Sequence, residues 1–304
     1  MSLLSPKKTK IHGHRGARGI YPENSLPAIQ YALETGCHAI EVDLCVTRDN
    51  QLVVHHDPVL SADCVRQPYG DWVTPGIRIR DCSLEQIRQF DIGRIRPDSA
   101  YAQQFPHQQP IDGTHIPTLE EFILQVKEYS DDVVFNIELK SAKPGLNYFP
   151  PPETYVDLVL LQLVEHRIVD RCFLQSFDWR LVCHAKEKQP SLLTGFLTDM
   201  QPDGSPISPI SGKPDFWSNN QNLADFGDSV PRMIHSLGGD VWSGNYRDLT
   251  PQDIESAHDI GLDVYVWTVN DPVDMIRMIE WGVDVITTDY PKRGVDLLSP
   301  NPTP

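Results

Sequence analysis

The stretch AIEVDLCV at residues 39–46 is a short apolar run that carries two acidic residues, and it predicts a strand buried in a sheet. Working outward from it, similar runs rich in β-branched residues recur along the chain. They lie at residues 11–14, 133–139, 172–177, 192–197, 240–245, 263–269 and 283–287. Amphipathic segments separate most of these runs, and strands that alternate with helices predict a parallel sheet.

Eight strands, with a helix after nearly every one, favour a (β/α)8 TIM barrel within the α/β class. An open doubly wound sheet remains the alternative, because one sequence does not show closure. Apolar residues spaced i, i+3, i+4 and i+7 predict helices whose apolar stripes face the sheet. The two clearest stripes are Leu119, Phe122, Ile123 and Val126, and Val156, Val159, Leu160 and Leu163.

Residues that cap helices support this alternation. Thr250 is followed by Pro251 and, about three turns later, by Gly261, which predicts a helix with an N-cap and a left-handed C-terminal residue. Asn24 and Gly36 are expected to bracket the first helix in the same way.

We expect one domain over residues 1–304, with a barrel core at 10–298. Residues 58–116 are rich in Pro, Gly, Gln and Arg and hold one short helical pattern near 83–90, so they predict an insertion after the second strand. Loops at the carboxyl ends of barrel strands build active sites, which makes this insertion a candidate lid or specificity wall. Residues 199–222 are expected to form a surface loop.

The composition argues against several classes of function. Lys and Arg number 26 against 42 Asp and Glu, a formal charge of −16, whereas nucleic-acid binders need clustered cations. No apolar stretch approaches the roughly 20 residues that cross a bilayer, and the N-terminus lacks the apolar segment of a secretory signal. The six cysteines form no Cys-x-x-Cys pair, so neither a zinc site nor a disulfide framework is expected. We therefore predict a cytoplasmic protein without stable membrane insertion.

Charged residues stand on the predicted strands. Side chains alternate along a strand, so Glu41 and Asp43 share one face, and Glu138 and Lys140 share a face of the next core strand. Carboxylates that converge on a barrel mouth repel one another unless positive charge lies among them. A hard divalent cation, Mg²⁺, Ca²⁺ or Mn²⁺, is one source of that charge. A salt-bridge network with Lys140 and Arg15 is the other.

Histidines supply a second signal. His14 ends the first run, and the segment QLVVHHDP at 51–58 ends in His55 and His56. Two imidazoles from separate segments are the parts needed for general acid and base catalysis near neutral pH. Beside the carboxylates, they predict an active site.

In their order along the chain, these residues resemble the glycerophosphodiester phosphodiesterase family, whose fold is a TIM barrel. The resemblance extends from His14 to Pro291. It rests on His14-Arg15-Gly16, Pro22-Glu23-Asn24-Ser25, Glu41-Val42-Asp43, Thr47-x-Asp49, His56-Asp57, the segment DCSLEQIRQFDIG at 81–93, Pro117-Thr118-Leu119-Glu120-Glu121, Asn136-x-Glu138-x-Lys140, Gln175-Ser176-Phe177, Trp267-Thr268-x-Asn270, Gly282-x-Asp284 and Thr288-Asp289.

The resemblance implies metal-dependent hydrolysis of glycerophosphodiesters to sn-glycerol 3-phosphate and an alcohol, a reaction of lipid and glycerol metabolism. The implied roles are metal binding, usually of Mg²⁺ or Ca²⁺, by Glu41, Asp43 and Glu138; acid and base catalysis by His14 and His56; and phosphate binding by Arg15 and Lys140.

Three positions call for comment. Ser25 replaces the commoner threonine of its motif and keeps the hydroxyl. His56 is preferred to His55 because it precedes the motif aspartate, and His55 is expected on the opposite strand face. Trp267 is a candidate contact for the glycerol or alcohol moiety, with packing as the alternative.

Other functions remain open at this point. One alternative is a related lipid phosphodiesterase, phospholipase D-like or phosphatidylinositol phospholipase C-like. Such an enzyme would share the site but would need an apolar or basic patch that faces a membrane. A non-catalytic phosphate-binding barrel would lack one of the mapped residues. A metal-dependent aldolase or enolase-type lyase would use the carboxylates and Lys140 on a carbonyl substrate. The preferred alcohol, the metal used in the cell and the oligomeric state are not predicted.

Overall fold

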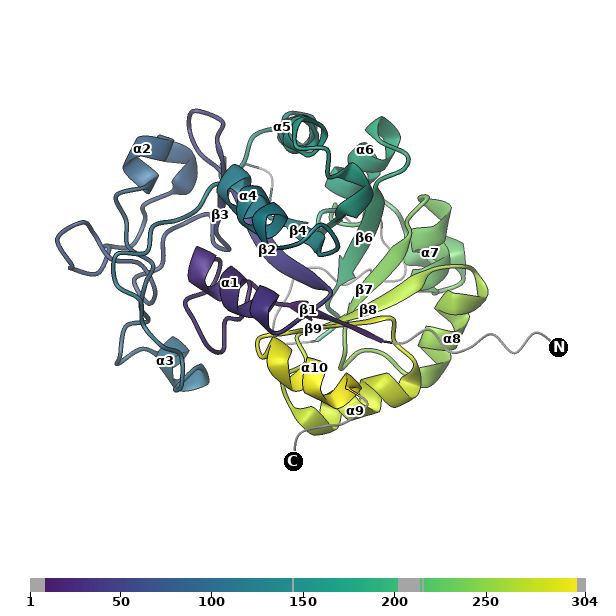
Figure 1. The fold of residues 1–304 in the computed structure, drawn as a ribbon. Helices are drawn as coiled ribbons and strands as arrows, with labels where there is room; N and C mark the ends of the chain where they lie inside the picture. The colour runs from purple at the N-terminus through teal and green to yellow at the C-terminus, as the bar shows by residue number, and fades with distance from the viewer. Residues whose placement is uncertain (1–8, 144, 202–213, 215, 300–304) are drawn as a thin grey trace.

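The computed structural model describes residues 9–143, 145–201, 214 and 216–299. Eight parallel strands form a closed barrel, because β1 pairs with the last strand and also with β2 (Figure 1). The barrel strands are β1 (Lys10–Gly13), β2 (Ala39–Val46), β4 (Val134–Leu139), β5 (Cys172–Ser176), β6 (Leu193–Thr198), β7 (Val241–Asn245), β8 (Asp263–Trp267) and β9 (Val285–Thr288). The predicted (β/α)8 barrel is confirmed, and the open sheet is wrong.

Helices pack around the outside of the barrel, as Figure 1 shows. They are α1 (Leu26–Glu34), α4 (Leu119–Tyr129), α5 (Pro152–Glu165), α6 (Trp179–Lys188), α7 (Val230–Ser236), α8 (Pro251–Asp259), α9 (Pro272–Trp281) and α10 (Pro291–Leu298), with short 3₁₀ turns η2 (Val169–Arg171) and η3 (Leu223–Phe226).

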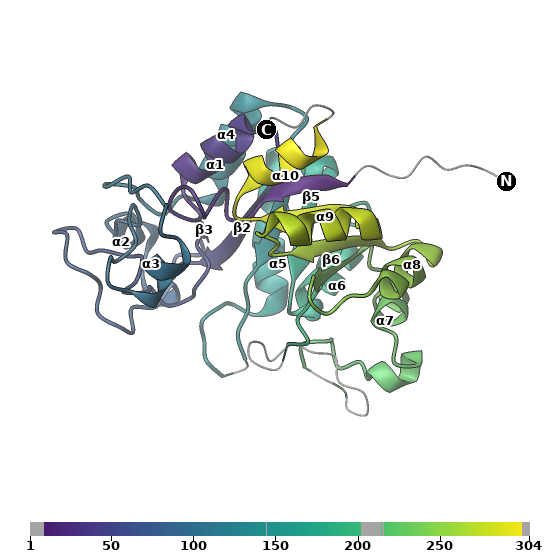
Figure 2. The ribbon, with the colours of Figure 1, turned by 90° about the horizontal axis from the view of Figure 1, so that it is seen from below.

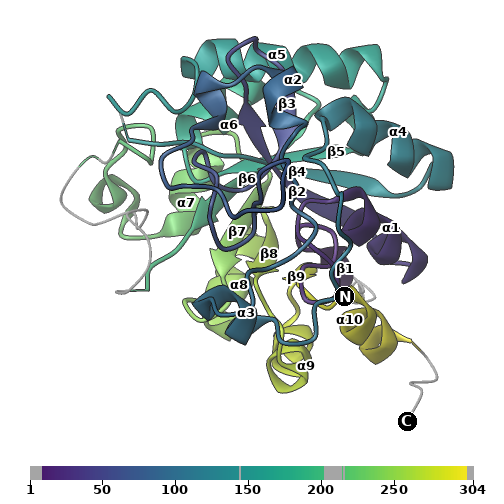
Figure 3. The same ribbon diagram turned by 90° about the vertical axis from the view of Figure 1, so that its left-hand side faces the viewer.

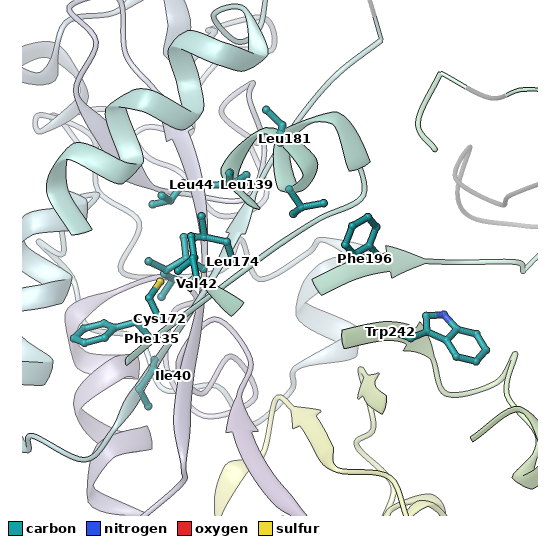
Figure 4. Close-up of a cluster of buried hydrophobic side chains, with 14 of the residues drawn as sticks. Ile40, Val42, Leu44, Phe135, Leu139, Cys172, Leu174, Leu181, Phe196 and Trp242 are labelled. Carbon is teal, nitrogen blue, oxygen red and sulfur yellow. The ribbon is translucent and has the colours of Figure 1, made fainter. Parts of the chain in front are cut away.

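The main core lies between the strands and these helices. The stripe predicted on α4 is buried, and so are three of the four stripe residues on α5, while Leu160 packs at the edge of the core. Figure 4 shows part of this core, where Leu44, Leu139 and Leu174 of neighbouring strands lie together. Because strand side chains alternate, the polar side chains of β2 and β4 are directed to the other face, into the barrel.

One helix start differs from the prediction. Thr250 caps α8 as expected, and Gly261 has a left-handed φ of +85° just beyond the helix. The first helix, however, is capped by Ser25, whose Oγ accepts a hydrogen bond from the Ala28 amide. Asn24 is not the cap because its side chain is committed to Asp43 across the barrel mouth, with Nδ2 donating to Oδ2 at 2.8 Å.

The predicted insertion begins after β3 (Leu52–Val54), a short strand antiparallel to β2, and ends before α4. It contains η1 (Ile79–Asp81), α2 (Leu84–Ile87) and α3 (Ala100–Gln104). The insertion lies to one side of the barrel beside α1 and β3, and Figure 3 shows it nearest the viewer (Figures 2 and 3). Its own small core forms against β2 and β3 and consists of Cys45, Val53, Leu60, Val65, Val73, Ile79, Ile87, Ile92 and Ile116.

Two further expectations can be compared with the structure. All six cysteines are free thiols, and Cys45 and Cys172 are buried, so no disulfide framework forms. Among the described residues, no helix has both the length and the apolar character needed to span a membrane. Most of the surface loop expected at 199–222 lies outside the described residues.

Candidate active site

A cavity of about 220 Å³ opens where the carboxyl ends of the barrel strands meet. Seven of the eight predicted site residues line it, and the eighth, Asp43, is buried directly behind. The cavity lining consists of His14, Arg15, Arg18, Glu41, His56, Glu138, Lys140, Gln175, Phe177, Leu197, Trp267, Thr268 and Thr287. None of these comes from residues 58–116, so the insertion does not form the expected wall of this cavity.

The strand register brings the three predicted carboxylates together. In the parallel pairing of β2 with β4, Asp43 stands opposite Glu138, and Glu41 is two residues back on the same face. One oxygen from each carboxylate lies within 4.8 Å of those of the other two. All three side chains are buried, so their mutual repulsion is poorly screened by solvent.

Two cationic side chains and one side-chain amide interact with two of these carboxylates, Asp43 and Glu138. Lys140 Nζ lies 2.5 Å from Glu138 Oε1 and 3.5 Å from Asp43 Oδ1. Arg15 Nε lies 3.2 Å from Asp43 Oδ2, which also accepts the Asn24 hydrogen bond. Burial opposes the ionisation of Asp43, but Arg15 and Lys140 hold the pKa of its carboxyl well below the usual range.

Glu41 differs from the other two carboxylates in its hydrogen bonding. Its Oε2 accepts a hydrogen bond from the Arg15 backbone amide at 2.7 Å, but its buried Oε1 has no hydrogen-bond partner among the described residues. Burial, with Asp43 and Glu138 nearby, raises the pKa of Glu41 well above its ordinary value. A salt-bridge network therefore accounts for Asp43 and Glu138 but not for Glu41. An orphaned carboxylate oxygen beside two further carboxylates fits a hard divalent cation, which takes oxygen ligands.

His14 is anchored from behind by a buried carboxylate. Its Nδ1–H donates to Asp289 Oδ1 at 2.6 Å, which fixes the tautomer and leaves Nε2 unprotonated, 3.9 Å from Glu41 Oε2. Asp289 is itself held by the Arg18 guanidinium and by Asn270 Nδ2, at 2.8 Å and 2.7 Å. Burial, together with the nearby Arg18, lowers the pKa of His14 to about 4, so the imidazole is neutral at pH 7.

His56, which also lines the cavity, is held by a carboxylate in the same way as His14. Its Nδ1 donates to Asp57 Oδ1 at 2.6 Å, and the hydrogen bond with His56 contributes to holding the pKa of Asp57 at about 2 against the effect of burial. His55 is buried and lines a different, nearly closed gap beneath the insertion. Of the two histidines, His56 therefore lines this cavity, and its catalytic role stays a prediction.

Aromatic side chains also line the cavity. Trp267 and Phe177 meet edge to face with ring centroids 5.4 Å apart, and Trp267 Nε1 donates to the Ser243 carbonyl at 3.1 Å. The Lys140 ammonium lies 5.9 Å from the Phe177 ring centroid. The cavity thus combines charged and aromatic side chains, which suits a ligand with a phosphate and a small carbon skeleton.

Comparison with known proteins agrees with this geometry. The model of the glycerophosphoryl diester phosphodiesterase family matches residues 14–293, which is nearly the whole chain. The chain belongs to this family. A glycerophosphodiester phosphodiesterase of Caldanaerobacter subterraneus is 27% identical over 291 residues, covering 96% of this chain and 98% of the relative. One from Bacillus subtilis is 26% identical and covers 95% of this chain and 86% of the relative.

Solved structures of the family share the fold. A protein of Silicibacter pomeroyi assigned to the glycerophosphoryl diester phosphodiesterases superposes with a TM-score of 0.85 at 32% identity, over 97% of this chain and 94% of that one. An Oleispira antarctica phosphodiesterase, in complex with the product sn-glycerol-3-phosphate, superposes with a TM-score of 0.67 at 22% identity, over 94% of this chain and 95% of that one. The family match and the curated relatives show that the chain is a phosphodiesterase, which is an enzyme of the hydrolase class.

Sequence reasoning missed several residues of the phosphodiesterase site. Arg18 received no role, although it lines the cavity and holds Asp289. Asp289 received no role beyond its place in the Thr288-Asp289 motif, and Asn24 was interpreted as a helix cap. For Asp289, the signal was its place directly after the eighth strand, where barrel enzymes carry functional residues.

Glu41→Gln should raise the thermal midpoint of the metal-free phosphodiesterase by about 2–4 °C, because it removes a buried carboxylate that lacks a cation partner. Asp43→Asn should lower the midpoint, because Arg15, Lys140 and Asn24 would lose their acceptor. Differential scanning calorimetry in EDTA compares the two variants. A loss of stability in Glu41→Gln as large as that in Asp43→Asn would show that Glu41 is compensated within the protein.

Asp289→Asn should lower kcat by about 10²-fold or more, because an amide can donate to His14 Nδ1 and so favour the wrong tautomer. Asp284→Asn is the matched control, since Asp284 pairs with His258 Nε2 at 2.7 Å and lies next to the opposite end of β9. Steady-state kinetics on folded protein decide the matter: equal effects of the two substitutions on kcat would remove the role assigned to Asp289.

Proposed function

We propose that this member of the family hydrolyses glycerophosphodiesters to sn-glycerol 3-phosphate and an alcohol, with a divalent cation held by Glu41, Asp43 and Glu138 and with His14 and His56 as the acid and base pair. The unpartnered Glu41 Oε1 inside the carboxylate cluster carries the proposal for the metal. The two imidazoles, each fixed at Nδ1 by a carboxylate, support the assignment of acid and base. The donor set favours Mg²⁺ or Ca²⁺ over zinc, because it contains oxygen atoms alone.

Arg15 and Lys140 are proposed to bind the phosphate. Both line the cavity, and both are already held in place by carboxylates, Arg15 by Glu23 and Lys140 by Glu138. A phosphodiester carries negative charge that grows on its non-bridging oxygens as the reaction proceeds, so cations that are fixed beforehand stabilise the transition state most. A bound divalent cation would add Lewis-acid stabilisation of those oxygens and lower the pKa of a coordinated hydroxyl.

The histidines then move the protons. We propose that the neighbouring glycerol hydroxyl attacks phosphorus while the Nε2 of one imidazole, which is neutral at the start, takes its proton. The other imidazole enters the step as an imidazolium and gives its Nε2 proton to the departing alcohol oxygen as the bond from that oxygen to phosphorus breaks. Water opens the resulting cyclic phosphate with the two roles exchanged, which returns both imidazoles to their starting states. The hydrogen bonds from Nδ1 to Asp289 and Asp57 keep each Nε2 free for these transfers.

The aromatic pair of the cavity is proposed to receive the carbon skeleton. Trp267 and Phe177 offer an edge and a face to the glycerol or alcohol moiety, and Lys140 beside Phe177 would bind the phosphate next to it. That the Oleispira antarctica neighbour holds sn-glycerol 3-phosphate supports a product of this class.

Metal removal tests the first part of the proposal. EDTA should abolish the release of glycerol 3-phosphate from glycerophosphocholine, and Mg²⁺ or Ca²⁺ should restore it; Glu138→Gln should need a metal concentration at least about tenfold higher. A coupled glycerol 3-phosphate assay gives the readout and also excludes a lyase or a binding protein, neither of which forms that product. Full activity in EDTA after dialysis would remove the metal from the mechanism.

His14→Ala and His56→Ala should each lower kcat by about 10²–10⁴-fold while circular dichroism stays native, because each loses a proton-transfer group. His107→Ala, an exposed histidine of the insertion, should leave kcat unchanged. Near-normal turnover in either of the first two variants contradicts the two-histidine assignment.

A further inference from the structure

The insertion docks on the loop that joins β1 to α1, which carries His14 and Arg15. Gln108 Nε2 donates to the Arg18 carbonyl at 2.7 Å, and the Gln109 amide donates to the Ile20 carbonyl at 2.8 Å. The Arg18 guanidinium lies 4.7 Å from the centroid of the Phe105 ring. These contacts hold the segment around α3 against the back of the site, although none of its residues lines the cavity.

One of these contacts reaches a predicted phosphate ligand. The hydroxyl of Tyr101, on α3, donates to Glu23 Oε2, and Glu23 Oε1 accepts a hydrogen bond from Arg15 Nη1 at 2.8 Å. Tyr101 and Glu23 also line a gap of only about 10 Å³ between insertion and barrel, so the two side chains meet in a nearly filled seam. Glu23 is 12% exposed, and water competes little for its oxygens.

Arg15 depends on such support. Its backbone has a left-handed φ of +49°, which is rare for a non-glycine residue, and the Glu41 carboxylate accepts its amide hydrogen. Glu23 accepts a hydrogen bond from Nη1, whereas Asp43 lies 3.2 Å from Nε as an ion pair and Nε itself forms no hydrogen bond with any described residue, so the bond to Glu23 is the one that fixes the guanidinium. Among the described residues none bonds Nη2, which is left for a ligand in the cavity that Arg15 lines.

We propose that Tyr101 is a positioning residue: through Glu23 it fixes the rotamer of Arg15 that binds phosphate. The insertion therefore acts on the active site from behind. The proposal rests on the proposed function only in taking Arg15 as a phosphate ligand.

Tyr101→Phe removes one hydroxyl and leaves the ring in the seam. It should weaken the binding of inorganic phosphate about tenfold and lower kcat/KM for glycerophosphocholine by a similar factor, the size expected for losing one hydrogen bond to a charged group. Tyr69→Phe is the matched control, because Tyr69 lies in the same insertion and is 94% exposed, and it should behave as wild type. Calorimetric titration with phosphate in the presence of Mg²⁺ measures the first quantity.

A double-mutant cycle separates positioning from general stability. In an Arg15→Ala background, Tyr101→Phe should have no further effect on phosphate binding, because the group it positions is gone. Glu23→Gln tests the same link from its other end and should weaken phosphate binding at least tenfold. If the losses from Tyr101→Phe and Arg15→Ala multiply, or if Tyr101→Phe binds phosphate as wild type does, the proposal is overturned.

The two readouts also separate this proposal from the function it rests on. If wild type binds phosphate but does not hydrolyse glycerophosphodiesters, the proposed function fails while the phosphate titration still decides the role of Tyr101. If wild type binds no phosphate, Arg15 is not a phosphate ligand and the positioning role fails with it.

Discussion

The repulsion among Glu41, Asp43 and Glu138 is the constraint on which the rest of the site depends. The register of β2 against β4 forces the three carboxylates together, and the closed barrel prevents the strands from moving apart to relieve the repulsion. The neighbouring polar groups reduce this repulsion: Lys140 and Arg15 supply positive charge, and Asn24 supplies an amide that donates a hydrogen bond. Glu41 keeps one buried oxygen without a hydrogen-bond partner among the described residues, and a bound cation would supply the positive charge that is missing there.

Carboxylates also fix the side chains on the loops that follow the strands. Strand ends fix the carboxylates, while the loops that carry His14 and His56 are fixed by Asp289 and Asp57. Arg15 is held from three sides, and the third partner, Glu23, is reached by the insertion. A site whose parts come from rigid strands and pinned loops needs little reorganisation when charge develops on the substrate, which is the condition for strong electrostatic stabilisation.

The sequence predicted those features that depend on residues close together in the chain, such as the face of a strand or the buried stripe of a helix. Alternation along β2 was enough to place Glu41 and Asp43 on one face, and apolar spacing identified the buried stripe of α4. The strand count favoured a closed barrel but did not establish closure, because closure depends on pairing between β1 and strands more than 25 and 270 residues away. Asn24 was misassigned for the same reason: its sequence context favours a helix cap, but the long-range hydrogen bond to Asp43 takes its side chain. The insertion contacts the site through residues that match no motif, and only the fold reveals them.

The charges around the cavity bear on how an acidic protein would bind the proposed anionic substrate. Three basic side chains, Arg15, Arg18 and Lys140, line the cavity. Five buried or nearly buried carboxylates surround them, namely Glu23, Glu41, Asp43, Glu138 and Asp289. If all are ionised and the histidines are neutral, the local balance is 3 − 5 = −2, which would repel a phosphodiester. One divalent cation brings this balance to zero and leaves Arg15 and Lys140 with charge to offer the phosphate. The carboxylates that oppose phosphate binding in the bare chain are therefore the groups through which a metal would permit it.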